Sequence, residues 1–214
     1  MERDKEKTRE RILQTLGRLL SQKGFENLGI NSIAREAKVS KVLIYRYFGG
    51  LAELLRAFAQ EGGYWPSATE LLGADINLRR VTNTEQISVT LLSNYLKEIR
   101  RRKVTQEIMR WELIQKNELT EQLSRIREKQ RTEILGALPI DAAKYCDIDL
   151  GAAAALLHAG ITFLVLQAKV ADEYMGIDLH SNYGWKRLEK AIEALVNGYF
   201  GQHRIMTEPG NTKK

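Results

Sequence analysis

The segment 41–48 reads Lys-Val-Leu-Ile-Tyr-Arg-Tyr-Phe and combines two anchoring side chains with several that could contact nucleic acid. Ile44 and Phe48 are four residues apart, so on a helix they share one face and pack into a core. Lysine and arginine bind phosphates, arginine also reads base edges, and apolar side chains contact thymine methyl groups. We therefore expect a short helix whose outward side chains face DNA, wholly or partly: Lys41, Val42, Leu43, Tyr45, Arg46 and Tyr47.

Several of these side chains also have a purely structural interpretation. Arg46 could be a solvated surface arginine, Tyr45 could pack on a helix bundle, and Tyr47 could cover the core with one face. If Arg46 does face DNA, a base contact and a phosphate contact are both open. The pair Val42-Leu43 is unusually apolar for a DNA-facing position and points to thymine methyl groups.

The neighbouring residues predict the helices that would position this segment. A short helix is expected over 30–37, followed by a turn at Lys38 and Val39 and an N-cap at Ser40. Two short helices joined by a tight turn and braced by a third form a helix-turn-helix, in which the second helix enters the major groove of DNA. Flanking helices are expected over 8–23 and 51–61, where apolar residues recur at helical spacing.

The positive charge of the chain is concentrated around this motif. The 214 residues carry a net charge of +6. Residues 1–50 hold 11 Lys and Arg against 6 Asp and Glu, a net charge of +5, and the remaining chain is nearly neutral at +1. Because phosphate attraction supplies most sequence-independent affinity for DNA, a localised basic module predicts a DNA-binding end.

The rest of the chain predicts further helices and no sheet. Helices are expected near 84–102, over 104–136 as one or two elements, over 149–173 and over 184–201, with loops at 73–83 and 174–183. The stretch 150–168 is uncharged and about long enough to span a bilayer. Its Ala, Gly and Thr content and polar His158 and Gln167 favour a buried helix in a bundle instead. The fold class expected is all-α.

Signatures of catalysis and metal binding are missing from the sequence. The single cysteine, Cys146, cannot form an intrachain disulfide, and the three histidines show no metal-ligand spacing. Phosphate-binding glycine loops and nucleophile motifs are also missing. We therefore expect no enzyme, no catalytic or metal-binding residues, no cofactor and a cytoplasmic location. A redox role for Cys146 and a helical enzyme or carrier remain alternatives.

Residues 8–60 resemble the DNA-binding domain of the tetracycline-repressor (TetR) family. The resemblance rests on the apolar first helix, Gly24-Phe25, Ile33-Ala34, Val39-Ser40 and the run Ile44-Tyr45-Arg46-Tyr47-Phe48, in order and at the family's spacing. It implies that the outward side chains of 41–48 are recognition-helix contacts, and that the supporting helix and the cap add others: Asn31, Ser32, Arg35 and Ser40.

Three features depart from the family pattern, and the apolar pair Val42-Leu43 is one of them. Gly29 stands where a Ser or Thr often caps the second helix, and glycine offers no side-chain acceptor there. Gly49-Gly50-Leu51 replaces a segment that usually carries a phosphate-binding lysine. Backbone N–H groups at the start of the following helix can still bind phosphate.

The resemblance also implies a ligand-binding and dimerising domain after the motif. Polar and aromatic residues of this part could line a pocket, although each could equally be plain core: Tyr95, Met109, Trp111, His158, Thr162 and Phe163. Small and apolar residues of 149–173 and 184–201 could form a four-helix dimer interface, since small residues let helices approach closely: Ala153, Gly160, Leu188, Ile192, Leu195 and Tyr199.

The expected organisation is a DNA-binding domain at 5–62 (motif about 30–48), a ligand-binding and dimerisation domain at 63–206, and a disordered tail at 207–214. The expected function is a homodimeric repressor that binds a palindromic double-stranded operator, is released by an unknown small-molecule effector and has no membrane partner. A regulator without a ligand, or an activator, is the alternative. The basic run Arg100–Lys103 either caps a helix C-terminus or links ligand state to the DNA-binding domain.

Overall fold

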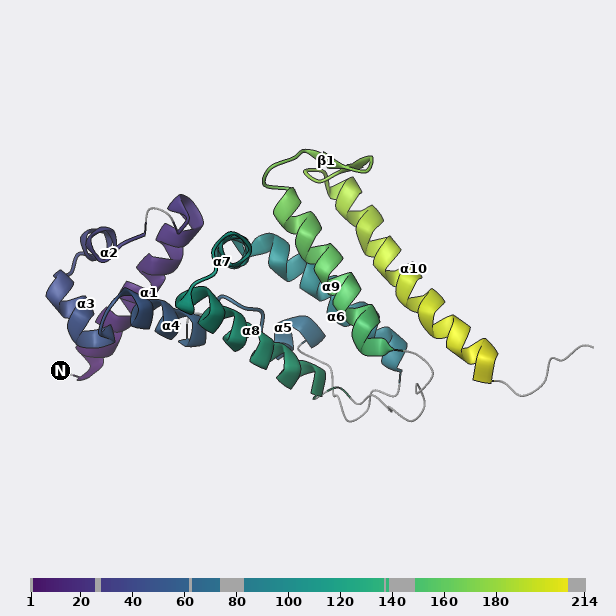
Figure 1. Cartoon of the computed structure of the whole chain (residues 1–214), viewed down its shortest axis with the longest axis horizontal. Helices are drawn as coiled ribbons and strands as arrows, with labels where there is room; N and C mark the ends of the chain where they lie inside the picture. Colours follow the sequence, from purple (N-terminus) through teal and green to yellow (C-terminus); the bar gives the residue numbers. More distant parts are fainter. Residues whose placement is uncertain are drawn as a thin grey trace, which may run out of the picture. The chain divides into compact units, whose positions relative to one another are not determined.

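The expected all-α fold is confirmed in a computed structural model of the chain, which describes residues 2–25, 28–61, 63–73, 83–136, 138 and 149–207 (Figure 1). The described residues form helices and one two-stranded hairpin: α1 (Glu2–Lys23), α2 (Ile30–Ala37), α3 (Lys41–Phe48), α4 (Leu51–Glu61), α5 (Ala68–Leu72), α6 (Thr84–Arg101), α7 (Lys103–Ile114), α8 (Glu118–Gly136), α9 (Leu150–Gln167), β1 (Glu173–Tyr174), β2 (Ile177–Asp178) and α10 (Asn182–Thr207).

The helices group into two compact units. The first unit spans 1–67 and 101–136 and holds α1–α4 with α7 and α8. The second spans 68–100 and 137–214 and holds α5, most of α6, α9, the hairpin and α10. The domains expected from the sequence, with a boundary near residue 62, remain a prediction.

The core of the first unit is built from the apolar residues that recur at helical spacing in the sequence. Ile12, Leu16 and Leu20 of α1 are fully buried, and so are Ile44 of α3 and Leu54 of α4. Because the apolar residues repeat at helical spacing and the caps are local, α2, α3 and α4 have the bounds that the sequence predicts. The bounds of α1 differ at one end, since its charged N-terminal turns are also helical.

The second unit differs from the sequence prediction in several places. The helix expected over 149–173 ends at Gln167, and the loop expected over 174–183 contains the antiparallel hairpin of β1 and β2. Left-handed backbone at Met175 (φ 50°) and Gly176 (φ 74°) makes its turn. The short helix α5 has too few residues for a periodic signal, so the sequence did not predict it.

The start of α10 packs tightly against the hairpin. The Asp178 carboxylate accepts hydrogen bonds from the backbone N–H groups of His180 (2.7 Å) and Ser181 (3.0 Å), and these bonds hold its pKa below the usual value. The indole N–H of Trp185 donates to the carbonyl of Leu179 at 2.6 Å. A Cβ at Gly184 would overlap the carbonyl oxygen of Asp178, so only glycine fits there.

Among the described residues, α9 is the one helix long and apolar enough, by length and composition, to cross a membrane. Only 11% of it is buried within the chain. Its buried residues include Ile161 and Val165, whereas Leu156 is 76% exposed and Phe163 is 48% exposed. Much of the apolar surface of α9 therefore lacks a partner within the described part of the chain.

Candidate nucleic-acid interface

The motif of α2, turn and α3 is held by local hydrogen bonds. Gly29 has no side chain, and the hydroxyl of Ser32 makes the cap instead: it accepts from the Gly29 N–H (3.1 Å) and donates to the Gly29 carbonyl (2.8 Å). Lys38 ends α2 in a left-handed conformation (φ 53°). The Ser40 hydroxyl then accepts from the Leu43 N–H at 3.2 Å and caps α3.

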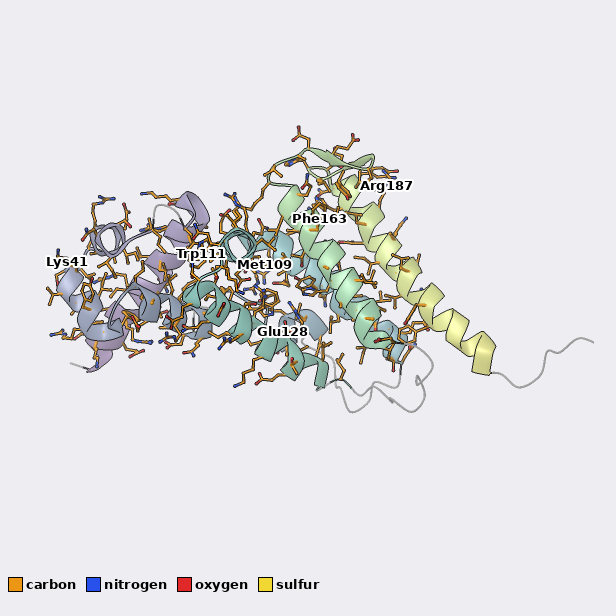
Figure 2. All side chains as sticks on the ribbon, viewed as in Figure 1. Lys41, Met109, Trp111, Glu128, Phe163 and Arg187 are labelled. Atoms are coloured by element: carbon orange, nitrogen blue, oxygen red, sulfur yellow. The ribbon has the colours of Figure 1, made fainter. Side chains whose placement is uncertain are left out.

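The outer face of α3 is exposed as the sequence predicts. Ile44 and Phe48 are buried, whereas Val42 is 70% exposed and Tyr45 is 53% exposed. Leu43 and Tyr47 are half-buried. The other residues expected to contact DNA through their side chains are exposed, except Ser32, which is half-buried: Asn31, Arg35, Ser40, Lys41 and Arg46 (Lys41 is labelled in Figure 2).

Cations surround the Tyr47 ring at the edge of α3. The Arg46 guanidinium lies 5.4 Å from the ring centroid, and the Lys5 ammonium of α1 lies 5.9 Å from it. No ion pair to a carboxylate occupies Lys5 or Arg46 within the described part of the chain. Lys5 is therefore a further candidate for phosphate contact. The sequence shows a basic N-terminus but cannot place Lys5 beside α3, because that neighbourhood depends on how α1 crosses α3.

Arg9 of α1 connects α3 to α4. Arg9 of α1 hydrogen-bonds to Glu61 of α4, and its guanidinium lies 5.2 Å from the Phe48 ring centroid. The hydrogen bonds from Arg9 hold the pKa of Glu61 below its usual value. One arginine of α1 thus contacts both α3 and α4, which helps to fix the direction of α3.

Two residues that were expected in a ligand pocket lie on α7 of the first unit. The Trp111 ring stacks on Phe25 at a centroid distance of 3.8 Å, and its indole N–H donates to Gln115 at 2.8 Å (Trp111 is labelled in Figure 2). Met109 is 5% exposed. Trp111 therefore connects α7 to the turn directly after α1, the helix that braces the motif.

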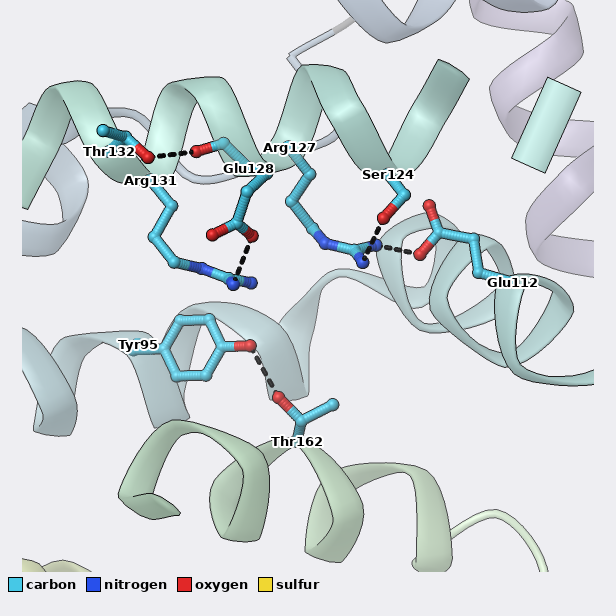
Figure 3. Close-up of polar contacts among 8 residues, drawn as sticks. All are labelled: Tyr95, Glu112, Ser124, Arg127, Glu128, Arg131, Thr132 and Thr162. Atoms are coloured by element: carbon cyan, nitrogen blue, oxygen red, sulfur yellow. Dashed lines mark hydrogen bonds and ion pairs between the residues drawn. The ribbon is translucent and has the colours of Figure 1, made fainter. Parts of the chain in front are cut away.

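The other residues expected in the pocket lie in the second unit. The hydroxyls of Tyr95 on α6 and Thr162 on α9 are 2.7 Å apart (Figure 3), and the His158 ring stacks on Tyr95 at 4.2 Å. Phe163 is half-exposed and meets Tyr174 of the hairpin edge-on at 5.3 Å. The structure therefore brings Tyr95, His158 and Thr162 together, with Phe163 on an outer surface.

The residues expected at a dimer interface lie along α9 and α10, which run antiparallel beside each other (Figure 1). Gly160 is exposed, and Leu195 is 59% exposed. Ile192 is buried within the chain. Three others are half-buried, namely Ala153, Leu188 and Tyr199, and the Tyr199 hydroxyl donates to the carbonyl of Asp149 at 3.1 Å.

The basic run Arg100–Lys103 is divided between two helices. The Arg100 guanidinium lies 4.3 Å from the Trp185 ring centroid, and its burial lowers its pKa. Arg102 directly precedes α7 without a side-chain cap hydrogen bond, and its guanidinium donates to the carbonyl of Gly63 at 2.6 Å. Each of these two arginines thus has a structural partner. Cys146 lies outside the described residues.

Comparison with known proteins identifies the motif. Residues 12–58 match the family described as bacterial regulatory proteins, tetR family. No curated protein sequence matches the chain.

Solved structures share the fold over most of the chain. The fatty acid degradation regulator FadR from Bacillus halodurans is 19% identical, with a TM-score of 0.62 over 88% of this chain and 97% of that one. FadR from Bacillus subtilis, solved with stearoyl-CoA, is 17% identical, with a TM-score of 0.60 over 87% and 96%. A TetR family transcription regulator from Marinobacter aquaeolei VT8 is 15% identical, with a TM-score of 0.56 over 89% and 98%. At these identities the likeness shows the fold.

Proposed function

We propose that this chain, whose residues 12–58 belong to the tetR family of bacterial regulatory proteins, is a homodimeric repressor that binds a palindromic operator. The observation that carries the proposal is the exposed face of α3. Its anchoring residues are buried in the core, while its cationic and aromatic side chains face outward and are not paired with carboxylates in the described residues. A helix of this kind can enter the major groove while its other face holds it on the domain.

Release of the operator by a small molecule completes the proposal. The family's regulators bind DNA and small-molecule ligands, and one solved structure of this fold holds stearoyl-CoA. In this chain the hydroxyl and ring contacts of Tyr95, His158 and Thr162 offer polar anchors for a ligand. The Trp111–Phe25 stack offers a route from α7 to α1. The coupling required between the ligand and operator sites is a few kcal/mol.

Selection of bound sequences from random double-stranded DNA tests the repressor proposal. A two-fold dimer presents two recognition helices, so the enriched sequences should be palindromic. Their half-site centres should lie about 34–36 Å apart or a multiple of that spacing. Enrichment of a single half-site would contradict the dimer, and no enrichment at all would contradict sequence-specific binding.

The homodimer is expected to use the uncovered faces of α9 and α10. Leu156 and Leu195 are 76% and 59% exposed, and a second copy would remove this apolar surface from water. The double change Leu156→Glu with Leu195→Glu places charges in that interface. We expect the variant to elute as a monomer in size-exclusion chromatography with light scattering, and to bind the operator more weakly.

A matched variant separates the interface from general surface effects. Met175 of the hairpin turn is 87% exposed, so Met175→Glu adds a charge to the same unit outside the proposed interface. This control should remain dimeric. A double variant that also remains dimeric would reject α9 and α10 as the dimer interface.

A further inference from the structure

A cluster of buried polar side chains lies in the first unit, away from α3. Tyr64 comes from the connection between α4 and α5, Glu112 from α7, and Arg127 and Arg131 from α8. Tyr64 is 4% exposed, and the side chains of Glu112 and Arg127 are 8% and 14% exposed, whereas that of Arg131 is partly buried at 28% exposed. Charged groups are almost never buried this far unless they are paired or bind a ligand.

Some of the polar atoms in this cluster are paired within the chain (Figure 3). Arg127 forms an ion pair with Glu112 and lies 3.5 Å from the Ser124 hydroxyl, with its guanidinium 5.6 Å from the Trp65 ring centroid. Arg131 donates to Glu128 at 2.7 Å. These contacts hold the two guanidinium groups in place and leave their Nε–H groups free.

Other polar atoms of the cluster are buried without a hydrogen-bond partner in the described part of the chain. Two of them are guanidinium donors, the Nε atoms of Arg127 and Arg131. The third is the Tyr64 hydroxyl, and the last two are acceptors, Oε1 of Glu112 and Oε1 of Gln130. Folded proteins contain few such atoms, so five in one short stretch of α7, α8 and the α4–α5 connection call for a bound group.

The charge of the cluster indicates what the group is. Two guanidinium groups face one buried carboxylate, since Glu128, the other partner, is 62% exposed. Burial raises the pKa of the Tyr64 hydroxyl to about 12, so it stays protonated and can donate. The open donors therefore suit a carboxylate, and each open acceptor suits one donor group, such as a hydroxyl, on the same molecule.

We propose that Tyr64, Glu112, Arg127 and Arg131 form a binding site for a small hydroxycarboxylate. The ligand carboxylate accepts from the Arg127 and Arg131 Nε–H groups and from the Tyr64 hydroxyl. The ligand hydroxyl donates to Glu112 Oε1. Gln130 Oε1 accepts from a second donor on the ligand where one is present.

The site adjoins two contacts that reach α1. Glu112 directly follows Trp111, whose ring stacks on Phe25 in the turn directly after α1. On the other side, the Tyr64 ring lies 6.1 Å from Phe58 of α4, and a Cβ at Gly17 of α1 would be 3.1 Å from the Phe58 ring. Occupation of the site can therefore shift α1. An effect of this shift on operator binding rests on the proposed function, whereas binding of the ligand to the site does not.

Glycolate is the smallest probe with both groups. Titrated into the full chain, it should shift the Trp65 indole resonance saturably, with a Kd of about 1–10 mM, as expected for a ligand of so few atoms. Acetate, which lacks the hydroxyl, should bind more weakly, and ethylene glycol, which lacks the charge, should not bind. No saturable shift with glycolate would mean that water fills the site and would overturn the proposal.

Tyr64→Phe is the most specific test of the site, because it removes only the unpartnered hydroxyl. We expect the melting temperature without glycolate to rise and the glycolate affinity to fall about tenfold, as loss of one charge-assisted hydrogen bond implies. Arg131→Gln should weaken glycolate to a similar extent. A lower melting temperature with unchanged glycolate affinity in Tyr64→Phe would assign the hydroxyl a structural role and overturn the site.

Two matched variants and one parallel measurement complete the test. Tyr183→Phe and Arg125→Gln remove the same groups from exposed positions and should leave glycolate affinity unchanged. An equal loss in these variants would overturn the site.

Operator binding is measured on the same preparation without glycolate. Intact operator binding with no glycolate binding rejects this site alone, whereas lost operator binding rejects the proposed function.

Discussion

Arg46→Ala should lower operator affinity about 10- to 100-fold, which corresponds to about 1–3 kcal/mol. Arg46 is exposed on α3, and its guanidinium lies against the Tyr47 ring, so it is held at the exposed edge of the helix. Electrophoretic mobility shift or fluorescence anisotropy with the selected operator measures the effect. Tyr45→Ala should also weaken binding, because Tyr45 presents its ring on the same face.

The salt dependence of binding decides what Arg46 contacts. If it binds a phosphate, Arg46→Ala should reduce the slope of log K against log salt by about 1 and weaken all sequences equally. If it reads a base, the slope changes less and the preference at one operator position relaxes.

A second arginine provides the control for this experiment. Arg110 is exposed on α7 in the same unit, so Arg110→Ala removes the same charge from outside the motif. Its operator affinity should remain close to that of the unmodified chain. Unchanged affinity and sequence preference in both Arg46→Ala and Tyr45→Ala would reject α3 as the recognition helix.

Arg127→Met should lower the free energy of unfolding by about 3–5 kcal/mol at neutral pH. The Glu112 carboxylate is buried, and Arg127 is its ion-pair partner, so the change leaves a buried charge without compensation. Urea unfolding followed by circular dichroism measures the loss. The double variant Glu112→Gln with Arg127→Met removes both charges and should recover most of the stability.

The loss should depend on pH. Burial already raises the pKa of Glu112, and the Arg127 charge opposes that rise. Without Arg127 the pKa of Glu112 in the folded state rises further above its unfolded value. The folded state then binds the proton more tightly, so the stability of Arg127→Met should increase as the pH falls through the folded pKa.

A surface arginine on the same helix shows whether the effect comes from burial. Arg125 is 80% exposed and pairs with Glu121 at 3.7 Å, so Arg125→Met should change the free energy of unfolding by no more than about 1 kcal/mol. A similarly small change in Arg127→Met would mean that water reaches Glu112 in the folded chain.

Several features of the fold follow from short stretches of sequence. Helices α2, α3 and α4 have the predicted bounds because caps, glycines and apolar spacing act within about one turn of each other. The N-cap at Ser40 and the buried pair Ile44 and Phe48 are of this kind. The end of α9 at Gln167 does not follow from the local sequence, because the apolar residues Ala168, Val170 and Ala171 continue beyond it.

The sequence by itself determined the helical class, the motif at 30–48 and the face of α3 that carries the cations, because helix period and capping are local properties. Only the tertiary structure decided that Lys5 lies beside Tyr47, that Trp111 stacks on Phe25, and that Tyr64 is buried beside Arg127 and Glu112. The residues of each pair come from segments that lie far apart in the sequence or in different elements. Whether such residues come into contact depends on the angles at which the helices cross and on which polar groups are buried when the helices pack. No local sequence pattern encodes either of these.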